Sequence, residues 1–198
     1  MIKAIIFDMG GVILMNKAEE LFKNVSKHLG VDYNSFEELR GQYYKDMLKG
    51  NMSCKEFADI VKHTFKLNVD VLEKWREVYL EVMNVNKELL ELADELKKNY
   101  KVAIISNMPN MHAEINKERN VFSHFKPAFI SCEIGLIKPQ KEIFDLMLEK
   151  LKLKAEECIF IDDRENHLDV PKEMGFKVIH YTGNNNLMEQ LKQLEILF

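Results

Sequence analysis

The stretch Ala4-Ile5-Ile6-Phe7-Asp8-Met9-Gly10-Gly11 places four consecutive apolar residues before an aspartate, a methionine and two glycines. A short, continuous apolar run of this kind predicts a strand that is buried on both faces, as in a parallel sheet covered by helices. The polar residue that follows predicts the end of the strand. Because ligands bind at the carboxyl ends of strands in open α/β sheets, Asp8 is the first candidate functional residue.

Four further apolar runs of the same kind follow along the chain. They are Val102–Ile105, Ala128–Ile130, Cys158–Ile161 and Lys177–Ile179. Between the later runs, residues 86–98 and 141–152 carry leucine, methionine and phenylalanine side chains at helical spacing. Strands that alternate with helices predict a doubly wound, Rossmann-like α/β fold with a parallel sheet.

About 90 residues separate the first two apolar runs, far more than one crossover helix needs. They contain no strand-like run but four helical patterns, the first of which ends at Gly30. The other three begin at capping-box signatures, namely Ser35 with Glu38, Ser53 with Glu56, and Asp70 with Glu73. We expect residues 16–83, called the helical insertion below, to form an all-helical cap domain. Residues 1–15 and 84–198 are then the α/β core, with the insertion as a lid on the carboxyl edge of its sheet.

The composition of the 198 residues, 46% hydrophobic and 30% charged, is that of an ordinary soluble domain. No apolar run approaches the roughly 20 residues of a membrane span, and no signal-peptide pattern opens the chain. The three cysteines are far apart and form no CxxC pair, which indicates thiols in a reducing compartment. A net charge of −4 with scattered lysines argues against nucleic acid as a partner. We expect a cytoplasmic protein with no membrane partner, and the sequence leaves its oligomeric state open.

Polar residues follow several of the expected strands: Asp8, Ser106, Lys138 and the pair Asp162-Asp163. Each has an ordinary structural explanation as a helix cap, a turn residue or a solvated side chain. Together at one sheet edge they suit phosphate chemistry. Carboxylates form a hard oxygen site for Mg²⁺, and a hydroxyl and an ammonium group can bind phosphoryl oxygens. A carboxylate beside the metal can also act as a nucleophile.

The same residues carry a family resemblance. Ile5–Ile13, Ile104–Asn107, Gly135–Pro139 and Phe160–Asp163 resemble, in this order, the four motifs of the haloacid dehalogenase (HAD) superfamily. The helical insertion resembles that family's type 1 cap, so the resemblance covers essentially the whole chain. The Phe7-Asp8-Met9-Gly10 start is similar to the first motif of its sugar-phosphate phosphatase-like subfamily.

The resemblance implies a Mg²⁺-dependent hydrolase, a phosphatase that acts on a small phosphorylated metabolite such as a sugar phosphate through an aspartyl-phosphate intermediate. It also implies the residues of the site. The catalytic residues are Asp8 as the nucleophile, Ser106 and Lys138. The residues that bind the substrate are Ser106, Asn107 and Lys138. The metal site consists of Asp8, the backbone carbonyl of Gly10, Asp163, and Asp162 as an auxiliary acid.

The sequence departs from the family pattern at Gly10, where most of the family's phosphatases have a second aspartate that acts as general acid and base. Glycine keeps the backbone carbonyl but removes the proton donor. Two alternatives therefore stay open: a catalytically weakened protein that binds a phosphometabolite or a partner, and a metal-free 2-haloacid dehalogenase. The adjacent acids Asp162 and Asp163 argue against the dehalogenase, because a metal-free site has no use for them.

The histidines are less informative. His167 stands four residues after Asp163, where the family usually has Asp or Asn. It either holds a metal-bound water or lies on a helix surface. His28 and His63, both in the helical insertion, could supply the missing proton if a lid closes, and nothing in the sequence selects one of them.

Overall fold

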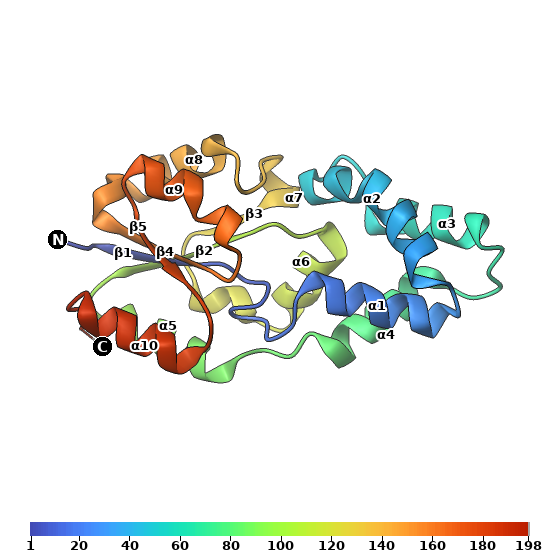
Figure 1. Cartoon of the computed structure of the whole chain (residues 1–198), viewed down its shortest axis with the longest axis horizontal. Helices are drawn as coiled ribbons and strands as arrows, with labels where there is room; N and C mark the ends of the chain where they lie inside the picture. Colours follow the sequence, from blue (N-terminus) through green and yellow to red (C-terminus); the bar gives the residue numbers. More distant parts are fainter. Residues whose placement is uncertain (198) are drawn as a thin grey trace.

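The structure, a computed structural model, describes residues 1–197. Its centre is a five-stranded sheet in the order β3-β2-β1-β4-β5, shown in Figure 1. The strands are β1 (Ala4–Phe7), β2 (Lys101–Ser106), β3 (Ala128–Ile130), β4 (Cys158–Asp162) and β5 (Lys177–His180). All four pairings between them are parallel. The doubly wound α/β fold predicted from the apolar runs is therefore confirmed.

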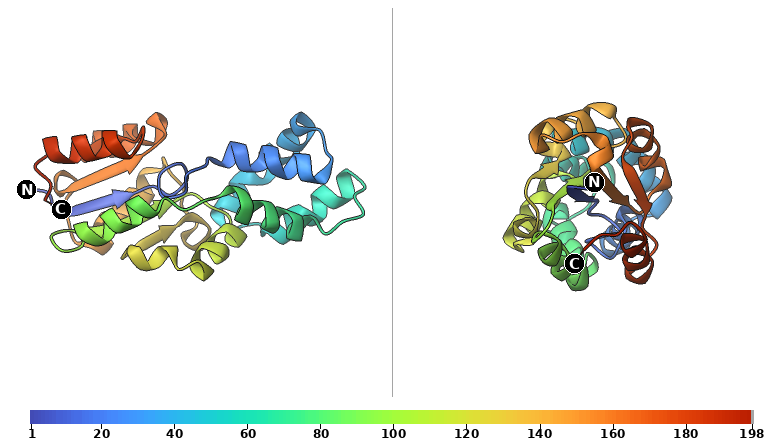
Figure 2. Two further views of the ribbon diagram at one scale, coloured as in Figure 1. Left: turned by 90° about the horizontal axis from the view of Figure 1, so that it is seen from below. Right: turned by 90° about the vertical axis from the view of Figure 1, so that its left-hand side faces the viewer.

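Both faces of the sheet are covered by helices (Figures 1 and 2). Successive residues of β1 point to opposite faces, so Ile5 and Phe7 belong to one apolar core, and Ala4 and Ile6 to the other. The first core includes residues of α5 (Lys87–Leu96), α6 (Asn110–Glu118) and α10 (Asn184–Gln193). The second is closed by α8 (Lys141–Leu151) and α9 (Asp169–Met174). Burial on both sides explains why the strand sequences are continuously apolar.

The helical insertion consists of α1 (Ala18–Leu29), α2 (Tyr33–Lys49), α3 (Cys54–Thr64) and α4 (Val71–Val82). These helices lie beyond the carboxyl ends of the strands, on the right of Figure 1. The chain enters and leaves the insertion through two adjacent segments, since the Met15 amide donates to the Asn84 carbonyl at 2.9 Å. The domain boundaries at residues 16 and 83 stay a prediction.

Four short helical turns complete the chain up to residue 197: η1 (Val121–His124), α7 (Ser131–Ile134), η2 (Ala155–Glu157) and η3 (Glu165–His167). Within residues 1–197, the helices are all too short or too polar to cross a bilayer.

The expected helix starts are correct in two of three cases. Ser53 and Glu56 form a reciprocal capping box at α3, and Asp70 caps α4 by accepting from the Glu73 amide. The prediction that Ser35 begins the second helix is wrong. The Asp32 carboxylate accepts from the Ser35 amide at 2.9 Å, so α2 begins at Tyr33. Aspartate is as good an N-cap acceptor as serine, and the earlier start adds most of a helical turn.

This difference between two serines can be tested with one substitution at each site. We expect Ser53→Ala to lower the free energy of unfolding by about 1 kcal/mol, because its hydroxyl accepts from the Glu56 amide. Ser35→Ala should cost less than half as much, because its hydroxyl donates to Asp32 and caps no backbone amide. Urea denaturation of both variants measures the difference, and equal losses would contradict the assignment of Asp32 as the cap.

Candidate active site

A buried lysine joins two carboxylates at the carboxyl edge of the sheet. The Lys138 ammonium lies 2.6 Å from Asp162 Oδ2 and also contacts Asp8 Oδ1, and the Lys138 side chain is 0% exposed. Asp8 follows β1, Asp162 ends β4, and Lys138 lies in the loop before α8. Parallel strand ends thus bring together side chains that are far apart in the sequence, such as Asp8 and Lys138, which are separated by 130 positions.

Lys138 is held in place through its backbone by Asn107. The Lys138 amide donates to Asn107 Oδ1, and Asn107 Nδ2 donates to the Lys138 carbonyl, both at 2.8 Å. The side-chain amide of Asn107 therefore positions Lys138. Asn107 also lines the pocket, and its predicted contact with a substrate stays a prediction. Ser106, buried at the end of β2, lines the same pocket as Asp8 and Lys138.

The three charges perturb one another strongly. Burial, followed by repulsion from Asp162, raises the pKa of Asp8 to about 7 although Lys138 opposes the shift. Burial would also raise the pKa of Asp162, but Lys138 and His167 together hold it well below its usual range. Burial disfavours the Lys138 ammonium, yet attraction to Asp8 and Asp162 leaves its pKa raised. Lys138 and Asp162 are therefore a firmly ionised pair, while Asp8 titrates near neutral pH in the metal-free protein.

His167 belongs to this cluster and is not a surface residue. Its side chain is 10% exposed, and its Nδ1 lies 3.1 Å from Asp162 Oδ2. The alternative of a helix-surface histidine is therefore wrong, because η3 turns the ring inward onto the acid. His28 and His63, the other candidates for a proton donor, do not line the pocket formed by the described residues. His28 instead faces Glu81 at 3.8 Å.

Asp163 is buried without a hydrogen bond. Its side chain is 3% exposed, and neither oxygen has a hydrogen-bond partner among residues 1–197. The Lys17 ammonium, from the segment before α1, lies 2.6 Å from Oδ2, outside hydrogen-bonding direction. Sequence reasoning missed Lys17, because no motif contains it and only the path of the chain brings it to Asp163.

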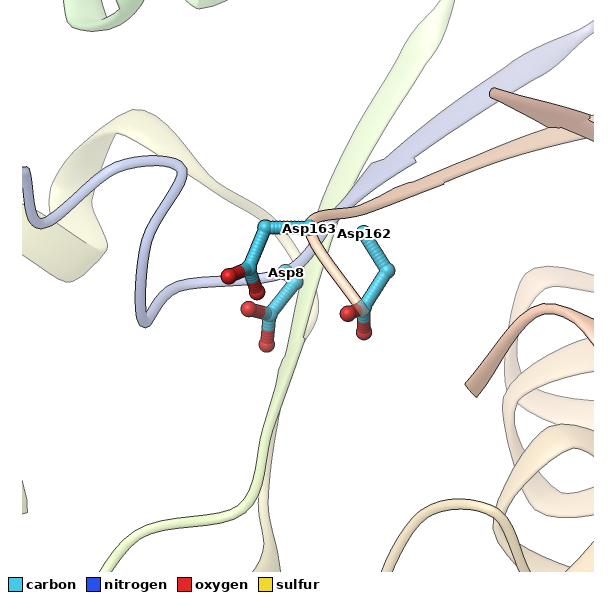
Figure 3. A group of neighbouring side chains, drawn as sticks. All are labelled: Asp8, Asp162 and Asp163. Carbon is cyan, nitrogen blue, oxygen red and sulfur yellow. The ribbon is translucent and has the colours of Figure 1, made fainter. Parts of the chain in front are cut away.

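The carboxylates fit a divalent cation. Asp8, Asp162 and Asp163 each offer an oxygen within 4.8 Å of the others, and Figure 3 shows the three side chains gathered at the strand ends. Lys17 gives Asp163 an ion pair, but the Asp163 oxygens accept no hydrogen bond among residues 1–197, so a cation bound by oxygen ligands would stabilise this carboxylate further. Asp162 is the least available of the three, because its oxygens already accept from the Arg164 amide, Lys138 and His167.

A pocket of about 90 Å³ opens on this cluster. One part of its wall comes from the core, including Asp8, Gly10, Ser106 and Lys138. The helical insertion supplies much of the rest with residues of α1, α2 and α4: Ala18, Leu21, Tyr44, Leu48 and Tyr79.

Aromatic residues of the insertion lie in two kinds of place. Trp75 is 1% exposed and packs on Phe22 and Phe57 inside the insertion. Tyr44 lines the pocket. The two neighbours Tyr43 and Tyr44 point in different directions on the helix, so only one of them faces Phe57.

The fold and the site agree with the family assignment. Residues 2–175 match the haloacid dehalogenase-like hydrolases. The chain belongs to this hydrolase family, as its four motifs indicated.

Individual relatives are distant. D-ribitol-5-phosphate phosphatase of Bacteroides thetaiotaomicron is 26% identical over 202 residues, which are 96% of this chain and 97% of that protein. Bifunctional epoxide hydrolase 2 of Mus musculus is 21% identical over 218 residues, 95% of this chain but only 38% of that protein. The chain thus spans well under half the length of the mouse relative. A solved HAD family enzyme from Bacteroides thetaiotaomicron, in complex with magnesium and inorganic phosphate, has a TM-score of 0.79 at 24% identity, covering 93% of this chain and 95% of that one.

Two neighbouring glycines give a matched test of the site. Gly11 has a φ of +83°, and a Cβ there would lie 2.5 Å from Asp163 Oδ2, whereas a Cβ at Gly10 meets nothing within 4 Å. We expect Gly11→Ala to lower the free energy of unfolding by at least about 1 kcal/mol and to weaken divalent-cation binding, because Asp163 must move. Gly10→Ala should change both quantities little. Urea denaturation and Mg²⁺ titration calorimetry measure them, and indistinguishable variants would contradict the geometry.

Proposed function

We propose that the protein is a Mg²⁺-dependent phosphatase that hydrolyses small phosphorylated metabolites. The observation that carries the proposal is the buried group of Asp8, Lys138 and Asp162, with Asp163 beside it. Asp8 and Lys138 of this group line the pocket. The group combines a carboxylate nucleophile, a phosphate-binding ammonium and oxygen ligands for a cation. The relatives described above include a sugar-alcohol phosphate phosphatase and an enzyme seen with magnesium and phosphate, which supports the same reaction.

Asp8, Asp163 and the Gly10 carbonyl would hold the Mg²⁺ ion, with Asp162 supporting it through Lys138. When bound, the ion neutralises the carboxylates and attracts phosphoryl oxygens to the site. Without it, the three carboxylates outnumber the two ammonium groups of Lys17 and Lys138. The ion would therefore reduce the repulsion between these carboxylates and a phosphate dianion.

The remaining chemistry falls to residues of this chain. Ser106 and Lys138 bind the phosphoryl oxygens and stabilise the charge that develops in the transition state. A carboxylate oxygen of Asp8 attacks phosphorus, a P–O bond forms, and the bond to the alcohol breaks. The leaving alkoxide takes up a proton. Water then attacks the aspartyl-phosphate, which releases inorganic phosphate and restores Asp8.

The helical insertion closes the site in this proposal. Its side chains line the pocket together with the core, so a substrate is enclosed between the two parts of the chain. A pocket of about 90 Å³ is smaller than the roughly 300–1,000 Å³ of sites that bind drug-sized ligands, which favours a small substrate. The insertion therefore acts as the lid that excludes water from the phosphoryl group.

Gly10 favours a second candidate function, binding of a phosphometabolite with little turnover. No carboxylate stands at this position to protonate the leaving group. The metal-free dehalogenase has weaker support, because such a site would leave the oxygens of Asp8, Asp162 and Asp163 within 4.8 Å of one another with no cation bound between them.

Asp8→Asn tests the nucleophile. The amide is nearly isosteric but cannot attack phosphorus, so we expect Mg²⁺-dependent hydrolysis of p-nitrophenyl phosphate to fall to less than about 1% of the wild-type rate. Asp145→Asn, an exposed aspartate paired with Lys141 on α8, is the matched control and should keep its full rate. Substantial turnover by Asp8→Asn, after deamidation is excluded by mass spectrometry, would refute the assignment of Asp8.

Gly10→Asp tests the missing acid and separates the two candidate functions. General acid catalysis is typically worth about 10²–10⁴-fold, and it matters most for poor leaving groups. The wild-type protein should hydrolyse p-nitrophenyl phosphate faster than alkyl phosphates, and Gly10→Asp should accelerate the alkyl substrates selectively. The open space around a Cβ at Gly10 allows the substitution. If wild-type rates do not depend on the leaving group and Gly10→Asp gives no gain, another group already donates the proton.

A further inference from the structure

One buried polar group in the pocket has no role in the chemistry described above. His112 lies on α6, is 5% exposed and lines the pocket. Its Nε2 is buried and has no hydrogen-bond partner among residues 1–197. A buried nitrogen without a partner destabilises the folded protein, so the structure retains His112 at a cost.

The ring of His112 is held by aromatic side chains of the helical insertion. Its centroid lies 4.3 Å from that of Tyr79 and 5.3 Å from that of Trp75, which it meets edge to face. Phe22 packs on it from α1 at 6.3 Å. Burial lowers the pKa of His112 to about 3, so the imidazole is neutral at physiological pH. A neutral imidazole offers one hydrogen-bond donor and one acceptor, and here both are carried by a ring that cannot turn freely.

The pocket that His112 lines has both apolar and polar walls. Its apolar residues are Leu14, Ala18, Leu21, Leu48, Met83 and Met108, and its polar residues outside the Lys138 cluster include Tyr44, Asn107 and Arg164. The Tyr79 hydroxyl already accepts from Asn116 Nδ2 at 2.6 Å. The other pocket histidine, His167, is bonded to Asp162. Among the described residues, His112 thus adds an uncharged imidazole to the pocket, held by aromatic side chains and with its Nε2 lacking a hydrogen-bond partner.

We propose that His112 binds a hydroxyl group of the substrate and so selects polyol and sugar phosphates over plain alkyl phosphates. This inference rests on the proposed phosphatase function. A hydroxyl of the leaving alcohol would satisfy the imidazole nitrogen, while the surrounding apolar side chains contact the carbon chain. An alkyl phosphate of the same length leaves the nitrogen unpaired, and sites built to bind a hydroxyl discriminate strongly against ligands that lack it.

A role in packing alone makes a different prediction for substrate selectivity. His112→Phe keeps an aromatic ring among Tyr79, Trp75 and Phe22 and removes the unpaired nitrogen. If His112 binds substrate, this variant should lose selectivity while its melting temperature stays the same or rises. If His112 only fills space, the variant should not change selectivity.

The test compares D-ribitol 5-phosphate with n-pentyl phosphate, which has five carbons and no hydroxyl groups, in the presence of Mg²⁺. The measured quantity is the ratio of kcat/KM for the two substrates. We expect the wild-type ratio to favour the polyol phosphate and His112→Phe to lower the ratio at least about tenfold. His112→Gln, which keeps an N–H donor and an oxygen acceptor, should restore part of it. The control His63→Phe, an exposed histidine on α3 outside the pocket, should leave the ratio unchanged.

Several outcomes would overturn the proposal. The wild-type protein could show no preference for the polyol phosphate. The ratio of kcat/KM could also stay unchanged in His112→Phe, including the case in which kcat/KM falls equally for both substrates. If the wild-type protein hydrolyses neither compound nor p-nitrophenyl phosphate, the proposed function fails. Calorimetric binding then tests His112 separately. D-ribitol 5-phosphate should bind His112→Phe at least about tenfold more weakly than wild type, with inorganic phosphate affected much less. Equal binding by both proteins would overturn the role of His112.

Discussion

The buried ammonium group of Lys138 is the interaction on which the site depends. It pairs with both Asp8 and Asp162, which would otherwise repel each other in a largely buried site. Removing one partner of such a buried group typically costs about 3–5 kcal/mol, because the other charges remain unpaired. Asp8 and Asp162 lie close together because β1 and β4 are neighbouring parallel strands that end at the same edge of the sheet. The ion pairs of the site therefore depend on this strand order. Asn107 then fixes the backbone that carries the lysine.

The helical insertion covers the site and also contributes side chains to it. It supplies Lys17, the cation nearest to Asp163, and most of the apolar wall of the pocket. Gly11 makes the approach of Asp163 possible, because any side chain there would collide with the carboxylate. The first loop of the core and the start of the insertion therefore shape the metal site together. A lid joined to the core by two adjacent segments can move as a unit, and such motion would carry Lys17 toward or away from the acids.

In the proposed reaction, Gly10 and His112 affect two different properties of the leaving group, its protonation and its recognition. Gly10 leaves open space where a proton donor could stand, which makes the reaction sensitive to the leaving group's own acidity. His112 is neutral and therefore suited to hydrogen bonding, and it is a poor proton donor. Recognition of the alcohol and protonation of the alcohol are then separate properties of this pocket, and each can change without the other. Both depend on groups outside the cluster around Lys138.

Much of the fold could be predicted from local pattern. Continuous apolar runs indicated the buried parallel strands, and Asp8, Ser106, Lys138 and Asp162 could be assigned to one edge because strand ends in a parallel sheet converge. Side-chain partners at longer range could not be predicted. Lys17 and His112 belong to no motif, and a buried histidine on a helix has the same sequence signature as an exposed one. Their positions follow from the packing of the insertion on the core. The sequence shows the periodicity of apolar residues within one helix or strand, but it does not show which helices and strands contact each other. Asp32 and Ser35 show the same limit at short range, since two good caps compete and only the folded backbone selects one.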